Sequence, residues 1–117
     1  FKNLPEKIEI YLLERFEKES IFFLNKYASK IWFSYQKLVI KTFKTKWGSC
    51  NTDTARTLFN LELAKKPYEC LEYIVVHELV HLFVRTHNDE FLAYMNQYLP
   101  DWKQRKALLR DQPLTDL

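Results

Sequence analysis

The sequence predicts a single α+β domain in which a small antiparallel sheet packs on helices. Residues 3–30 and 68–84 carry apolar side chains at helical spacing, which predicts two long helices. Residues 31–63 are instead rich in β-branched and aromatic residues in partial alternation with polar ones, which indicates strands. The chain contains one glycine, Gly48, and so few glycines disfavour a many-stranded sandwich with numerous tight turns.

Length and composition agree with one compact domain over residues 1–117. Hydrophobic residues make up 47% of the chain and aromatic residues 16%, which allows a packed core and excludes the disordered class. No stretch approaches the roughly 20 apolar residues of a membrane span, and no secretory signal is visible. The sequence starts with Phe1 rather than Met, so we expect a possible truncation at the N-terminus.

The first helix is expected to start near Asn3, a suitable cap, with Pro5 in its first turn. The segment "KLVIKTFKTKWGSC" predicts one or two strands, and "TARTLFNLEL" predicts another. A hairpin with a loop of more than two residues would join them. Pro67 suits the start of the next helix, which we expect to end between residues 83 and 85. Two further helices are predicted in "EFLAYMNQYL" and "DWKQRKALLR".

The most informative motif is H-E-x-x-H, formed by His77, Glu78 and His81 in an otherwise apolar helix. Four residues advance a helix by about 400°, so the two histidines lie within about 40° of each other and about 6 Å apart along the axis. They can therefore bind one metal ion, which for this motif is Zn²⁺. Glu78 is turned about 100° from His77, beside the metal, where it could deprotonate a metal-bound water.

A catalytic zinc site needs a third protein ligand, and His87 is the one histidine left in the chain. Asp89 or Glu90 is an alternative third ligand. The alternative without a metal is that the histidines are core residues that form hydrogen bonds to backbone groups. The H-x5-H spacing after the motif also fits the metzincins, but Val84 stands where those proteins carry glycine, and no Met-turn is identifiable.

Five stretches of the sequence resemble the YgjP-like metallopeptidase domain, a group of predicted metal-dependent hydrolases related to SprT-like and WLM domains. In chain order these are "KWGSC", "LFNLELAKKP", "LEYIVVHELVHL", "THNDEF" and "YLPDWKQRKALL". The resemblance implies a zincin-like fold, a zinc site of His77, His81 and His87, and Glu78 as the catalytic base. Family members usually carry a β-rich segment before the first long helix, and this chain does not show one.

The function predicted from these features is zinc-dependent hydrolysis of peptides or other amides. In zincins the substrate commonly pairs with a sheet edge beside the metal, and we expect Lys46, Trp47 and Gly48 to contribute to such an edge. Gly48 would let a second chain approach closely, although Trp47 is equally well explained as a core residue. An oxyanion stabiliser is also needed. The available side chains are Tyr68, Tyr73, Tyr94 and Arg56.

Two other classes of function remain open at this stage. Kinship with SprT-like proteases suggests a DNA-associated protease, in which Lys41, Lys44, Lys46 and the basic segment 103–110 would contact phosphates. A net charge of +3 gives this prediction of nucleic-acid binding weak support. A zinc-stabilised scaffold without catalysis is the other alternative, although a structural site needs no Glu78. Cys50 and Cys70 match no disulfide framework, so we expect free thiols in a cytoplasmic protein.

Overall fold

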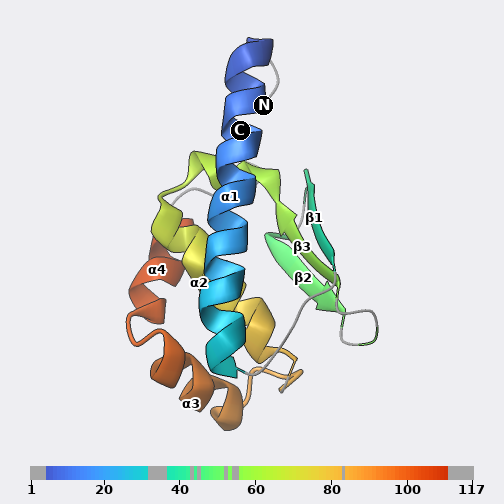
Figure 1. Cartoon of the computed structure of the whole chain (residues 1–117). Coiled ribbons are helices and arrows are strands. Elements are labelled where there is room, and N and C mark those ends of the chain that lie inside the picture. Colours follow the sequence, from blue (N-terminus) through green and yellow to red (C-terminus); the bar gives the residue numbers. More distant parts are fainter. Residues whose placement is uncertain are drawn as a thin grey trace.

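The computed structural model describes residues 5–31, 37–42, 44, 46–51, 53, 56–82 and 84–110. The predicted α+β class is confirmed, with helices on one side and a small sheet on the other (Figure 1). The predicted Asn3 cap lies outside the described residues. The elements follow one another as α1 (Glu6–Ile31), β1 (Lys37–Lys41), β2 (Gly48–Asn51), β3 (Arg56–Asn60), the 3₁₀ helix η1 (Leu61–Lys65), α2 (Tyr68–Val80), α3 (Asp89–Tyr98) and α4 (Trp102–Arg110).

Helix α1 packs on the domain through its C-terminal two thirds. Phe16, Phe23 and Tyr27 lie on the predicted apolar face and are buried. Ile8 belongs to the same predicted face but is 47% exposed. Figure 1 shows why, since the N-terminal end of α1 extends past every other element. The amphipathic pattern of α1 is therefore longer than the surface that it covers in this chain.

The sheet has the strand order β1-β3-β2, and its pairing is mixed. Strands β2 and β3 form the predicted antiparallel hairpin, in which Gly48 pairs with Phe59. Strand β1 instead pairs parallel to β3, with Ile40 opposite Phe59, so the prediction of a purely antiparallel sheet was wrong. Strands β1 and β3 both run opposite to β2. Because β3 lies in the middle of the sheet, it pairs parallel with β1 and antiparallel with β2. Both β1 and β2 are thus edge strands in the part of the sheet that the structure describes.

Helix α2 lies at the centre of the core, and most of its side chains are buried, whichever face of the helix they are on. It contacts α1, α3, α4 and β2, which explains why its sequence is apolar around the whole circumference. The helix ends at Val80, earlier than predicted, and His81 is its C-cap. Val84 is still buried although it follows the helix. The apolar pattern extends to Val84 because the turn also packs on the core.

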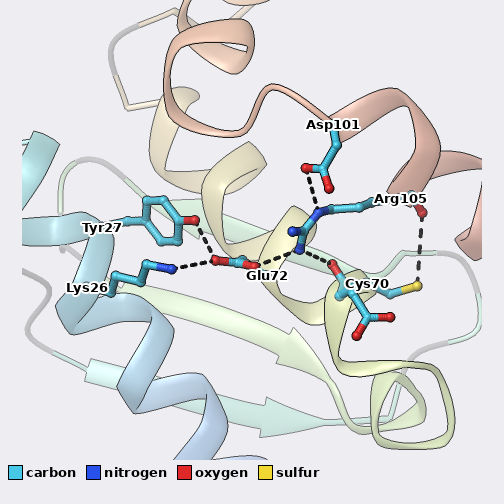
Figure 2. A network of polar contacts seen from close by, with 7 residues as sticks. Lys26, Tyr27, Cys70, Glu72, Asp101 and Arg105 are labelled. Atoms are coloured by element: carbon cyan, nitrogen blue, oxygen red, sulfur yellow. Dashed lines mark hydrogen bonds and ion pairs between the residues drawn. The ribbon is translucent and has the colours of Figure 1, made fainter.

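One buried carboxylate ties α2 to two other helices (Figure 2). Glu72 accepts hydrogen bonds from the Tyr27 hydroxyl at 2.5 Å and from Lys26 Nζ at 3.1 Å, both on α1. Arg105 of α4 donates to its other oxygen at 2.6 Å and to Asp101 at 2.9 Å. The basic segment predicted over residues 103–110 therefore does not act as one solvated face, because Arg105 is directed into the protein.

Candidate metal centre

The three histidines of the chain meet at the C-terminal end of α2. His77 lies in the last turn of the helix, His81 caps it, and His87 comes from the turn that leads into α3. Their ring centroids are separated by 4.6 Å for His77 and His81, 5.1 Å for His77 and His87, and 4.8 Å for His81 and His87. One ring nitrogen from each lies within 4.8 Å of the others. Such a cluster of nitrogens can surround one ion.

The hydrogen bonds of His81 fix which of its nitrogens faces the cluster. Its Nδ1 lies 3.1 Å from the carbonyl oxygen of Val84, which can only accept, so Nδ1 carries the proton. The Nε2 atom is then free of a proton, and it lies 2.9 Å from Nε2 of His87. Two nitrogens on one tetrahedral zinc are about 3.3 Å apart, given Zn–N bonds of about 2.0–2.1 Å. A carbonyl acceptor on the outer nitrogen is the usual support of a metal-binding histidine.

Phe91 supports the histidine cluster from the inside. It is buried, and its ring centroid lies 5.3 Å from that of His77 and 4.7 Å from those of His81 and His87. Asn88 caps α3 by accepting a hydrogen bond from the Phe91 backbone amide at 3.0 Å. The cap therefore sets the position of Phe91. From the sequence, this residue is predicted only to lie on the apolar face of its helix.

Glu78 lies beside the histidines, as the helical geometry predicts. Its Oε1 atom is 3.3 Å from Nδ1 of His77, and the residue is 8% exposed. Asp89 and Glu90, the alternative third ligands, are both exposed in the first turn of α3. Among the described residues, the group of potential ligands within mutual reach contains the three histidines and no carboxylate.

The electrostatic surroundings favour the neutral form of His87. Desolvation lowers its pKa below the ordinary value, the mutual repulsion that neighbouring imidazoles would have if protonated and the charge of Lys106 lower it further, and Glu78 opposes the shift. A neutral imidazole is the form that binds a metal ion.

Two hollows flank Glu78. The first has a volume of about 820 Å³ and is polar, with Gly48, Cys50, Arg56 and Arg85 among its lining residues. The second has a volume of about 480 Å³ and is more apolar; it is lined by Trp47, Gly48, Tyr73, Ile74, His77, Glu78, Lys106, Leu109 and Arg110. Strand β2 borders both hollows at Gly48, and its later residues line only the polar one. Arg85 and Lys106 were not among the site residues expected from the sequence, since a single basic residue near a turn or on a helix carries no such signal.

The predicted edge segment divides into residues with different surroundings. Trp47 and Gly48 line the apolar hollow, whereas Lys46 is exposed and lines neither hollow. A Cβ atom on Gly48 would lie 3.0 Å from Ile74 Cγ2, so the close approach at this glycine is that of α2. The structure thus gives Gly48 a packing role within the domain, and the expectation that it makes room for a second chain stays a prediction.

The four candidate oxyanion donors differ in whether they line a hollow beside Glu78. Tyr73 lines the apolar hollow with its ring centroid 5.7 Å from that of His77, and burial raises its pKa to about 12, which keeps it a neutral donor. Arg56 lines the polar hollow. Tyr68 stacks on Phe23 of α1, and Tyr94 stacks on Tyr98. Neither of these two tyrosines lines a hollow beside Glu78.

Two other expectations can be compared with the described residues. Cys50 is half-buried and Cys70 is buried, and both are free thiols, as expected. In the described part of the chain, no helix combines the length and apolar character that crossing a membrane requires.

Comparisons with known proteins identify a metallopeptidase family and similar metallopeptidase structures. The family model of the YgjP-like metallopeptidase domain matches residues 2–112. The solved structure of the metallopeptidase zymogen jannalysin of Methanocaldococcus jannaschii is similar, with a TM-score of 0.64, 20% identity, and coverage of 75% of this chain and 90% of that one. The zymogen abylysin of Pyrococcus abyssi gives 0.65 and 17%, with coverage of 79% and 90%. No curated protein matches.

Proposed function

The chain belongs to the YgjP-like metallopeptidase family, and on this premise we propose that it is a zinc-dependent peptidase in which His77, His81 and His87 hold the metal. One observation carries the proposal: three imidazoles present nitrogens within 4.8 Å of one another, directly beside the carboxylate of Glu78. A structural zinc site is normally closed by four protein ligands, whereas three ligands beside a carboxylate are typical of a catalytic site.

The residues present fit a zinc ion. All three donors are imidazole nitrogens, which zinc accepts readily, and the outer nitrogen of His81 is held by a backbone carbonyl. The His87 pKa is lowered, so this ligand needs little deprotonation. When bound, zinc supplies a Lewis acid that polarises the scissile carbonyl and acidifies water near pH 7.

The chain's own residues carry the proton transfers in this proposal. Glu78 accepts the proton of the attacking water at its carboxylate and passes it to the leaving amine. Glu78 is 8% exposed and its Oε1 atom lies 3.3 Å from Nδ1 of His77, which holds the carboxylate beside the histidines. Tyr73, as a neutral phenol beside His77, is the favoured donor to the developing oxyanion.

In this proposal, strand β2 holds the substrate backbone. It is an edge strand in the described sheet and borders both hollows beside Glu78. A peptide in extended conformation can add to such an edge by main-chain hydrogen bonds. The matching family and the two similar structures are metallopeptidases, and the proposal is limited to peptide or protein substrates.

The test compares zinc content and peptide cleavage in four proteins. Glu78→Gln is expected to retain one zinc per chain and to lose cleavage by at least about 100-fold, because the base is gone. His77→Ala is expected to lose both zinc and activity. Glu90→Gln is the matched control for a nearby exposed carboxylate and should retain both.

Parent-like cleavage by Glu78→Gln would contradict the proposed base. A parent protein that binds zinc tightly but cleaves nothing in a broad peptide library would support the scaffold alternative. Loss of zinc from Glu90→Gln would move the third ligand from His87 to that carboxylate.

A further inference from the structure

The apolar hollow beside the catalytic residues has the size and lining of a side-chain pocket. Its volume is about 480 Å³, and its walls include Trp47, Ile74 and Leu109. Ligand pockets of about 300–1,000 Å³ that are mostly apolar, with a few polar groups, are typical of specific binding sites. His77 and Glu78 line this hollow, so a substrate side chain bound in it would belong to a residue next to the scissile bond.

Two cations from α4 line the same hollow. Lys106 and Arg110 are four residues apart and therefore lie on one face of α4. Both cations line the same hollow as His77 and Glu78, so their charges act on a ligand bound there. Among the described residues that line the hollow, Glu78 is the one carboxylate. An apolar pocket with two cations fits a ligand that is apolar but ends in an anion.

The orientation of β2 indicates which end of a substrate reaches this pocket. Strand β2 runs from Gly48 at the apolar hollow to Asn51, which lines only the polar hollow. A peptide paired antiparallel to β2 would run from the Asn51 end toward the Gly48 end. Its C-terminal part would then lie at the apolar hollow, near Lys106 and Arg110.

We propose that this pocket selects an apolar residue on the C-terminal side of the scissile bond, and that Lys106 and Arg110 bind a carboxylate at or just after that residue. The inference rests on the proposed peptidase function and adds its substrate class. The carboxylate has two sources, which are the free C-terminus of a short peptide and an acidic side chain that follows the apolar residue. Either source presents the anion to two adjacent cations, where charge-assisted hydrogen bonds form.

Binding tests the proposal without requiring turnover. Zinc-loaded Glu78→Gln protein is titrated calorimetrically with acetyl-Ala-Ala-Phe as the free acid and as the amide. A second pair, acetyl-Ala-Ala-Phe-Asp amide and its Asn counterpart, separates the acidic side chain from the C-terminal carboxylate. We expect at least one charged peptide to bind about tenfold more tightly than its neutral partner, as a hydrogen bond between charged groups provides.

A pair of charge reversals on α4 assigns the effect to the pocket. Lys106→Glu should reduce the preference for the charged peptide to twofold or less. Lys103→Glu makes the same change of charge on the same helix, but Lys103 does not line the pocket, so the tenfold preference should remain. This comparison also removes the contribution of a carboxylate that binds zinc directly, because both variants retain the metal site.

Equal binding within both peptide pairs overturns the inference, and so does an equal loss of preference in the two lysine variants. The failure of the peptidase proposal has a different signature. In that case the zinc-loaded parent protein cleaves none of these peptides, while the binding preference and its dependence on Lys106 remain.

Discussion

At the scale of single residues, Phe91 connects the core to the candidate metal centre. Its ring contacts all three imidazoles, and the capped start of α3 holds it in place. A buried aromatic ring leaves the imidazoles few rotamers, because interiors are close-packed. The convergence of the rings is thus maintained by packing as well as by hydrogen bonds.

Replacing Phe91 should therefore weaken both stability and zinc binding. Phe91→Ala is expected to cost about 3–5 kcal/mol in the free energy of unfolding, from the lost transfer energy and the cavity. Its zinc affinity, measured by competition with a chelator, should fall at least tenfold, since the rings lose their support. Phe91→Leu retains most of the side-chain volume, so its stability and zinc affinity should lie between those of the parent protein and of Phe91→Ala. Unchanged zinc affinity in a folded Phe91→Ala protein would show that the ring does not position the ligands.

Gly48 gives a second prediction at this scale. Gly48→Ala places a Cβ atom 3.0 Å from Ile74 Cγ2 and 3.2 Å from the Leu58 carbonyl oxygen, so the Ile74 side chain or β2 must give way by a few tenths of an ångström. We expect a loss of about 1–3 kcal/mol in unfolding free energy, as for an overpacked core. The double variant with Ile74→Ala should lose less than the sum of the single changes, which denaturant unfolding of all four proteins can measure. Additive losses would exclude this contact as the cause.

The sequence predicts the site better at some residues than at others. The positions of His77, Glu78 and His81 follow from helical geometry alone, and the structure has them on one helix end with the expected relation. The approach of His87, Phe91 and the α4 cations depends on turns and on contacts between distant segments, which have no periodic signature. Gly48 is a similar case, because a glycine in a strand signals a close approach without showing which segment approaches.

At the scale of elements, the Glu72 network joins α1, α2 and α4 around the helix that bears the histidines. Burial would raise the pKa of Glu72, but hydrogen bonds from Tyr27, Lys26 and Arg105, together with the charge of Arg105, lower it below the ordinary value. The folded state therefore favours the ionised carboxylate. This contribution to stability is complete above the pKa of an unfolded glutamate, about 4.3, and is lost as the pH falls through the lower folded value.

This linkage predicts how Glu72→Gln depends on pH. At pH 7 the variant leaves Arg105 without its buried partner and should lose about 3 kcal/mol of unfolding free energy. As the pH falls below the unfolded pKa of about 4.3 and through the lower folded pKa of Glu72, the parent protein loses this contribution, so the difference in unfolding free energy between the two proteins should narrow. Glu19→Gln removes half of an exposed pair with Arg15 and should cost less than about 1 kcal/mol. A loss that stays constant from pH 7 to pH 3 would show that ionisation of Glu72 is not the cause.

The helices and the β2–β3 hairpin could be predicted from periodicity, and the parallel pairing of β1 could not. Parallel pairing of β1 with β3 requires that β1 and β2 do not pair with each other, so that β3 can insert between them. Local sequence does not encode that order, because an edge strand alternates in the same way in either pairing. The end of α2 was likewise hidden, since buried residues continue through the turn as far as Val84.

At the scale of the whole molecule, much of the core lies outside the candidate site. Phe59, Leu63 and Leu71 are almost completely buried and precede the three histidines in the chain, whereas His87 is exposed. The domain should therefore fold without zinc and gain stability when zinc binds only the native state.

Removal of the metal is expected to lower the melting temperature without unfolding the protein at 25 °C. With free zinc at about 1,000 times its dissociation constant, the native state gains about 4 kcal/mol, which corresponds to a shift on the order of 10 °C or more. Circular dichroism with and without a chelator measures this, and His77→Ala should show no shift. Loss of the helical signal on chelation at 25 °C would mean that the metal is required for folding.

The three histidines lie within eleven consecutive residues of the chain, between the last turn of α2 and the start of α3. A bound ion would therefore be enclosed by a short covalent loop, and its escape would require only that the turn over residues 81–88 open. The residence time of the metal would then follow the local opening rate of that turn, as amide hydrogen exchange reports it, and would be insensitive to substitutions in α1 that speed global unfolding.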